Sequence, residues 1–122
     1  MKFFNRKKKL DFSNFIYTER NALPTSFCNN VIEKFEQDDR KRQGQVGGGV
    51  HLDIKRSSDL SISGLNDWKS YDEAFYNSLH SALKRYSTFI PEEFYKFKAL
   101  STLSNDTGYQ IQRTQPGDYY IW

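Results

Sequence analysis

Apolar residues recur at helical spacing in two segments of this chain, and the first segment lies between Pro24 and Gln37. Proline is favoured in the first turn of a helix, and Thr25 or Ser26 can cap its start. The pattern therefore predicts a helix that begins after Pro24 and ends near Gln37. Its apolar stripe contains Phe27, Val31, Ile32 and Phe35.

The second helical segment begins at Ser70-x-x-Glu73, which is the spacing of a capping box. In such a box the serine oxygen accepts from the backbone N–H of the glutamate, and the glutamate side chain reaches back to the serine. The helix is expected to extend to about Ser87, because Pro91 opposes much further extension. Its apolar stripe contains Tyr71, Phe75, Leu79, Ala82, Leu83 and Tyr86.

Four short runs are expected to form strands, because they alternate apolar and polar residues or are rich in β-branched and aromatic ones. These runs cover residues 15–18, 50–55, 109–114 and 119–122. In the second run the apolar face contains Val50, Leu52 and Ile54.

These elements predict an α+β fold in which two amphipathic helices lie on an incomplete antiparallel sheet. Residues 1–14 are expected to form a basic, flexible lead-in, and residues 15–122 the folded portion. The four strands offer few inward positions for two wide apolar stripes. Further strands are therefore expected to complete the fold.

Composition limits the classes of function. Of 122 residues, 37% are hydrophobic and 16% aromatic, so one small domain with an aromatic-rich core is expected. The basic start lacks the apolar stretch of a secretory signal, and no segment has the roughly 20 apolar residues of a membrane span. A cytoplasmic location without membrane contact is therefore expected. Cys28, the single cysteine of the sequence, is expected to be a packed structural thiol.

The end of the chain predicts a hairpin. Gln115-Pro116-Gly117-Asp118 suits a type II turn, because proline presets the first central angle and glycine supplies the positive one. Alternation then places Gln110, Gln112, Thr114, Tyr119 and Ile121 on one polar face, opposite Ile111, Arg113, Tyr120 and Trp122. An unprimed turn often carries a bulge, so the register can slip by one at the two tyrosines.

These closing residues resemble the strand-turn-strand that leads into the iron site of prolyl-4-hydroxylase-like, 2-oxoglutarate and Fe(II)-dependent dioxygenases. The family pattern Gln-x-x-Arg-Tyr-x-x-Gly-x-x-Tyr is matched by Gln110, Arg113, Gly117 and Tyr120. Its His-x-Asp iron motif would begin at the residue after Trp122. Upstream, Leu23-Pro24 before the cysteine-containing helix and the stretch 53–60 are similar in order and spacing.

The resemblance implies the N-terminal part of a double-stranded β-helix, or jelly roll. The implied enzyme hydroxylates a peptide or small molecule with Fe(II) and 2-oxoglutarate. No catalytic residue and no metal ligand of the motif is expected within this chain, so it should be inactive alone and bind neither cofactor tightly. Thr114 stands where the family has a tyrosine that binds 2-oxoglutarate. The expected remnant of the cofactor pocket is one wall, formed by Gln112, Thr114, Tyr119 and Tyr120.

Other functions stay open. Exposed aromatic side chains are also typical of a non-enzymatic interaction module. The basic run 6–9 is compatible with a nucleic-acid-binding accessory protein, although four charges favour only weak, salt-sensitive binding and nucleic acid is therefore the less favoured partner. The unpaired edge of the strand at 119–122 is expected to permit self-association.

Two further patterns are interpreted as structural. His51-Leu-Asp53 is a literal His-x-Asp, but the only other histidine, His80, lies in the second predicted helix instead of on a later strand. An iron site at these three residues is therefore disfavoured. The glycines between 44 and 49 lack the following helix and the Lys-Ser/Thr pair of a phosphate-binding loop, so a flexible turn or the start of a strand is expected.

Overall fold

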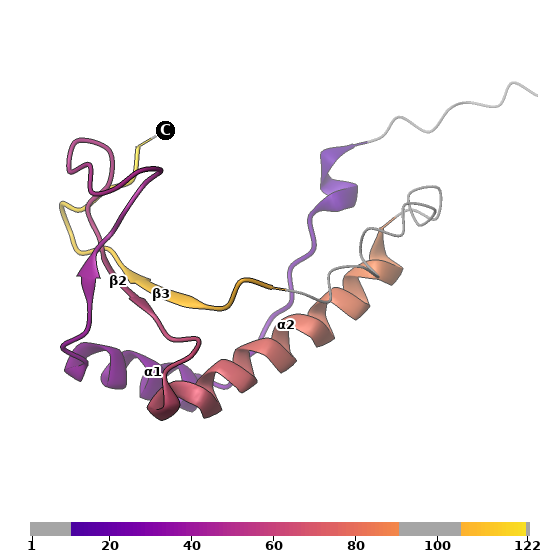
Figure 1. Cartoon of the computed structure of the whole chain (residues 1–122). Helices are drawn as coiled ribbons and strands as arrows, with labels where there is room; N and C mark the ends of the chain where they lie inside the picture. Colours follow the sequence, from indigo (N-terminus) through magenta and orange to yellow (C-terminus); the bar gives the residue numbers. More distant parts are fainter. Residues whose placement is uncertain (1–10, 91–105, 122) are drawn as a thin grey trace, which may run out of the picture.

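The computed structural model describes residues 11–90 and 106–121 of the chain (Figure 1). Most of the predicted lead-in and Trp122 lie outside these residues. The described part contains two helices, two short 3-10 helices and one antiparallel sheet with the strand order β1-β2-β3. The predicted α+β class is confirmed. The elements are η1 (Phe12–Phe15), α1 (Thr25–Gln37), β1 (Arg42–Gln43), β2 (Ser58–Ser61), η2 (Asn66–Trp68), α2 (Lys69–Phe89) and β3 (Gln110–Arg113).

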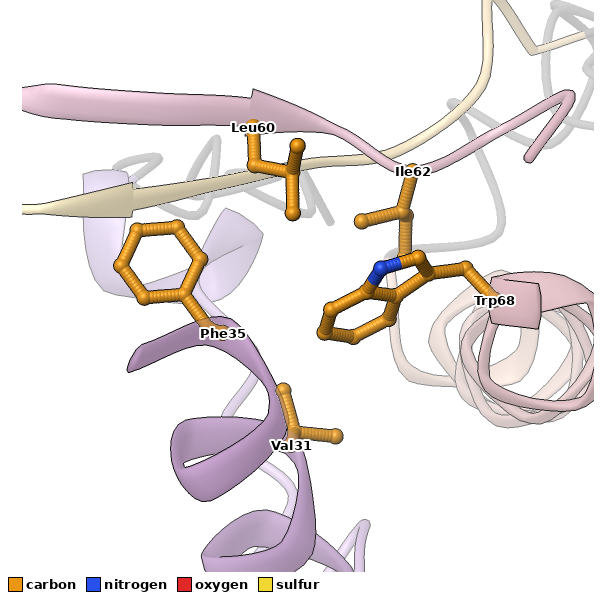
Figure 2. Packing of buried hydrophobic residues seen from close by; sticks show 5 residues of the cluster. All are labelled: Val31, Phe35, Leu60, Ile62 and Trp68. Carbon is orange, nitrogen blue, oxygen red and sulfur yellow. The ribbon is translucent and has the colours of Figure 1, made fainter. Parts of the chain in front are cut away.

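The hydrophobic core lies between α1, the sheet and η2 (Figure 2). Leu60 on β2 and Ile62 just after it point to the same side, because strand side chains alternate between the two faces. Trp68 and Ile62 are fully buried and form the centre. Val31 and Phe35 of α1 complete the cluster, which confirms the inner part of the stripe predicted for this helix. Ile32, also in that stripe, is instead exposed.

Helix α1 is capped at its end and not at its start. Pro24 is the N-cap and makes no side-chain hydrogen bond, so the predicted cap by Thr25 or Ser26 is wrong. At the other end the Lys41 ammonium donates to the carbonyl oxygens of Phe35 at 2.7 Å and Glu36 at 2.9 Å. A cation is favoured there, because the last carbonyls of a helix lack backbone partners and carry negative partial charge.

Helix α2 is present as predicted but starts differently. It begins at Lys69 with Trp68 as N-cap, and Ser70 is already helical, so the capping box with Glu73 is wrong. The Glu73 carboxylate instead lies 3.9 Å from the Lys69 ammonium. None of the helices in the described part of the chain is both long enough and apolar enough to cross a membrane.

The segment before α1 runs along α2 and not into the sheet, so the strand predicted at 15–18 is wrong. The Tyr86 hydroxyl donates to the Phe15 carbonyl at 2.9 Å, and the Ser78 hydroxyl donates to the Ala22 carbonyl at 3.0 Å. The Tyr17 ring packs against α2, and this contact would be lost if residues 15–18 joined the sheet.

The strand predicted at 50–55 is also wrong, because these residues form a turn in which Val50 and Leu52 are each 48% exposed. The strand lies a few residues later, as β2. Leu60 and Ile62 form the apolar alternation there, and burial of these two side chains fixes which run enters the sheet.

The predicted hairpin does not close on itself. The turn forms as expected, with Gly117 at φ 91° and a hydrogen bond from the Asp118 N–H to the Gln115 carbonyl at 2.8 Å. However, β3 pairs with β2, and Tyr120 beyond the turn pairs with Lys55 on the same upstream segment. The residues before and after the turn therefore both pair with the segment that contains Lys55 and β2, and residues 114–118 loop out between them.

Candidate functional site: a polar groove on the sheet

A groove of about 520 Å³ lies over the polar side of the sheet. Strand alternation puts Asp59 and Ser61 on the side of β2 opposite to the Leu60 side chain. All three strands contribute to its lining. The lining residues are Arg40, Arg42, Gln43, Gln45, Lys55, Asp59, Leu60, Ser61, Leu65, Gln110 and Gln112.

The Asp59 carboxylate is the centre of the groove floor and accepts four hydrogen bonds. Its Oδ2 accepts from Lys55 Nζ at 2.9 Å, Gln110 Nε2 at 3.0 Å and Gln112 Nε2 at 3.3 Å. Its Oδ1 accepts from the Ser57 hydroxyl at 2.7 Å. Lys55 and Asp59 are only 4% and 9% exposed, so the pair is a buried ion pair on the open side of a small sheet. Such a pair is tolerated because further hydrogen bonds satisfy the carboxylate.

Gly44, the residue after β1, lies close against the ion pair. Its N–H donates to the Ser57 carbonyl at 3.0 Å. A Cβ at this position would lie 2.1 Å from the Ser57 hydroxyl oxygen and 2.8 Å from Lys55 Cε. The absence of a side chain therefore allows Ser57 and Lys55 to approach the backbone at this position.

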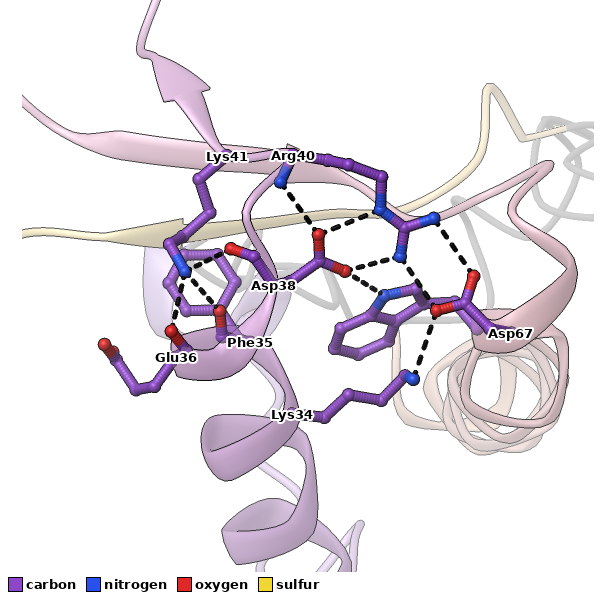
Figure 3. Close-up of polar contacts among 8 residues, drawn as sticks. Lys34, Phe35, Glu36, Asp38, Arg40, Lys41 and Asp67 are labelled. Atoms are coloured by element: carbon purple, nitrogen blue, oxygen red, sulfur yellow. Dashed lines mark hydrogen bonds and ion pairs between the residues drawn. The ribbon is translucent and has the colours of Figure 1, made fainter.

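A second charged cluster lies at one end of the groove and links α1 to η2 (Figure 3). Arg40 donates from Nε and Nη2 to the two Asp38 oxygens at 2.9 and 2.5 Å, and from Nη2 to Asp67 at 2.8 Å. Trp68 Nε1 donates to Asp38 at 2.8 Å, and Lys34 Nζ donates to Asp67 at 3.2 Å. The cluster thus ties the indole at the centre of the core to a residue of the groove lining.

The cluster shifts the pKa of each of its carboxyl groups downward. Hydrogen bonds from the Arg40 guanidinium, aided by the Trp68 N–H, hold the Asp38 pKa well below its usual range despite the opposing effect of burial. Arg40 and then Lys34 lower the Asp67 pKa to about 2. Both carboxylates are therefore charged at neutral pH.

Two of the four predicted pocket-wall residues meet at the buried ion pair. The Gln112 amide donates to Asp59, and the Lys55 ammonium lies 5.5 Å from the centre of the Tyr120 ring. A cation at this distance from an aromatic ring is attracted by its quadrupole. The Gln112 amide and the Tyr120 ring therefore both contact the Lys55–Asp59 pair, although the two residues lie on opposite sides of the loop 114–118.

The other two wall residues lie elsewhere. The Tyr119 hydroxyl donates to the Leu52 carbonyl at 2.6 Å, and its ring lies beside the Arg56 guanidinium at 5.6 Å. Thr114 is exposed at the start of the loop. The predicted face assignment at the two tyrosines is wrong, because the chain beyond the loop pairs with the upstream segment four residues out of register with β3, and Tyr120, not Tyr119, is the partner of Lys55.

The described residues do not fit the iron that the resemblance implies. Within residues 11–90 and 106–121, no three His, Cys, Asp or Glu side chains lie close enough together to hold a metal ion. His51 and Asp53 are exposed in a turn, and the His80 ring stacks on Tyr76 at 3.8 Å in α2. No step of the function proposed below passes through a metal on these residues.

The groove residues Lys55, Asp59, Gly44 and Arg40 are absent from the sequence-based site. One signal could have located Asp59. Apolar residues alternate at 60 and 62, which marks this run as a strand with Asp59 on its polar side. The Arg40–Asp38 cluster and the role of Gly44 carry no such pattern, because both depend on contacts with residues far along the chain.

Comparisons of the chain with protein-family models, with curated proteins and with solved structures find no match. The resemblance to the dioxygenases therefore rests on the matched residues alone. The function proposed below is argued from those residues and from the geometry around them.

Proposed function

We propose that residues 15–122 form the N-terminal portion of a prolyl-4-hydroxylase-like dioxygenase domain, which hydroxylates a peptide or small molecule with Fe(II) and 2-oxoglutarate. In this proposal the sheet is the beginning of a jelly roll, and the His-x-Asp iron ligands follow Trp122. The observation that carries the proposal is the placement of the four motif residues. Gln110, Arg113 and Tyr120 pair with the segment 54–62, which presents a polar face to the groove, and Gly117 lies in the loop that joins them.

Two motif residues support the proposal by bracketing the buried ion pair. Gln110 donates to the Asp59 carboxylate, and the Tyr120 ring lies over the Lys55 ammonium. In the proposed domain this face forms one wall of the cofactor pocket. Its contribution is to bind and orient 2-oxoglutarate through amide and phenol groups, with Gln112 between the two motif residues.

The other two motif residues support the proposal by holding that face in place. Arg113 Nη1 donates to Glu36 Oε2 at 2.5 Å, and its guanidinium carbon lies 5.8 Å from the centre of the Phe35 ring. These contacts tie β3 to α1. Gly117 has a φ of 91°, which residues with a Cβ rarely adopt. Both residues fix the backbone without filling the groove.

The described residues supply one wall of the proposed 2-oxoglutarate pocket and not a complete site. The Gln110 and Gln112 amides already donate to Asp59, so a second carboxylate would have to compete for them. We therefore assign to these residues binding and orientation only. The chain alone is expected to show no hydroxylase activity and no tight cofactor binding.

The coding sequence after the Trp122 codon provides the first test. We expect a histidine codon next and an aspartate codon two positions later. The protein extended to the end of that reading frame should bind Fe(II) and 2-oxoglutarate under anaerobic conditions, with a charge-transfer absorbance. The 122-residue chain is the matched control and should give none. A following sequence without this motif, or the same absorbance from the 122-residue chain, would contradict the proposal.

A further inference from the structure

The Lys55 ammonium is buried with an incomplete set of acceptors. It carries three N–H groups and is 4% exposed, and in the described part of the chain the one hydrogen-bond acceptor recorded for it is Asp59 Oδ2. A buried donor without an acceptor costs free energy, so such groups are almost always satisfied. Because Lys55 lines the groove, its remaining acceptors are best supplied by what the groove contains.

The groove also has one positive charge without a matching negative one. The Lys55 charge is offset by Asp59, and the Arg40 charge is offset by Asp38 and Asp67. Arg42 of β1 lines the same groove and is exposed, and no ion pair is recorded for it among the residues described. An exposed guanidinium and a buried ammonium therefore line the same groove.

We propose that this groove binds the carboxylate group of a monoanionic ligand, held between the Arg42 guanidinium and the Lys55 ammonium. A guanidinium matches a planar carboxylate with two parallel N–H donors. One uncompensated charge favours a monoanion, because a phosphate dianion or a dicarboxylate would bring a negative charge that remains unpaired. This inference does not rest on the dioxygenase proposal, although both use the same face of the groove. It differs in expecting a monocarboxylate where that proposal expects 2-oxoglutarate, which is a dicarboxylate.

The test is a titration of the 122-residue protein followed by NMR at constant ionic strength. The signals to follow are the side-chain amides of Gln110 and Gln112 and the backbone amide of Gly44, which surround the ion pair. The probes are sodium propionate, an N-acetylated peptide amide with one glutamate, 2-oxoglutarate, phosphate and chloride. Propionate stands for a small-molecule source of the carboxylate and the glutamate peptide for an acidic polypeptide.

Saturable shifts with propionate or the glutamate peptide are expected, and the tighter of the two identifies the source. Arg42→Gln should weaken binding about tenfold, as expected for loss of a charge-assisted hydrogen bond. Arg56→Gln is the matched control, because Arg56 is also exposed but lies beside Tyr119 and does not line the groove. Equal, unsaturable shifts with all anions, or the same affinity in the Arg42 variant and the control, would overturn the proposal. Tighter binding of phosphate or 2-oxoglutarate would overturn the assignment to a monocarboxylate.

A second variant tests the part played by Lys55. Asp59→Asn keeps the shape of the side chain but removes the internal carboxylate that Lys55 now uses. Propionate should then bind more tightly by about tenfold, since it becomes the only anion available to the ammonium. Unchanged or weaker affinity in a variant that keeps the circular dichroism spectrum of the parent would show that Lys55 takes no part.

Discussion

The two faces of β2 are buried to a similar degree by opposite means. Leu60 is 3% exposed because α1 covers it with Val31 and Phe35. On the other face Asp59 is 9% exposed, and ammonium and amide donors from its own segment and from β3 surround it. The stability of the apolar face therefore depends on side chains that fill the space around Leu60. The stability of the polar face depends on the hydrogen bonds that Asp59 accepts.

The largest effect should come from the centre of the apolar face. Trp68→Ala removes a fully buried indole and its hydrogen bond to Asp38, and is expected to lower the free energy of unfolding by about 4 kcal/mol. Phe12→Ala, at a ring that is 88% exposed, should change it by less than about 0.5 kcal/mol. Urea denaturation followed by circular dichroism measures both. Similar losses for the two variants would break the distinction between core and surface.

The next effect tests whether the polar face depends on its partners. Lys55→Met leaves the Asp59 carboxylate buried without its cation, and should cost about 3 kcal/mol of unfolding free energy. The double variant Lys55→Met, Asp59→Leu removes both charges and should recover most of this loss. The same urea experiment measures the pair. A double variant that is less stable than Lys55→Met would show that the net attraction, not the unpaired charge, stabilises this face.

A smaller loss of stability is expected from adding one methyl group next to Ser57 and Lys55 on the polar face. Gly44→Ala places a Cβ 2.1 Å from the Ser57 hydroxyl oxygen, so the floor must shift, at a cost of about 2 kcal/mol. Gly48→Ala is the matched control, since nothing lies within 4 Å of that Cβ position. Thermal unfolding of the two variants checks the difference. Equal midpoints would mean that the backbone at Gly44 does not lie tightly against Ser57 and Lys55.

The smallest effect concerns the cluster that joins the two faces. The Asp38 pKa is lowered in the folded chain, so its contribution to stability is present above the ordinary value of 3.8 and is lost as the pH falls below it. Arg40→Gln should flatten this acid dependence and cost about 1 kcal/mol at neutral pH. The exposed Lys69–Glu73 pair supplies the control, and Lys69→Gln should leave the profile unchanged. Urea titrations at several pH values measure it, and an unaltered profile in Arg40→Gln would contradict the assignment.

The helices could be predicted from the sequence because each repeats its apolar stripe over several turns. The strand predicted at 109–114 is present as β3, whereas β1 and β2 could not be predicted, because they contain two and four residues and bury few side chains. In such short runs the alternation at 50–54 is as regular as that at 58–62, and only packing on α1 and Trp68 selects the second.

The candidate site was predictable only where its residues form a local pattern in the sequence. The polar side of β3 is visible in the alternation of Gln110 and Gln112, which both contact Asp59. Their partner lies about fifty residues upstream, and a single sequence holds no signal for that pairing. The turn chemistry of Gly117 was correctly predicted, since it is local, while the strand partner that the turn serves was not.

The looped-out segment 114–118 has a consequence for how this surface can change over evolutionary time. The residues on either side of the loop are each paired with the segment 54–62. If the loop keeps its five residues, one inserted residue moves the following chain by one position and brings Tyr119 over Lys55, whereas one deleted residue brings Ile121 there. A single codon gained in this loop would thus change which tyrosine meets the buried charge, and a single codon lost would remove the aromatic ring from it.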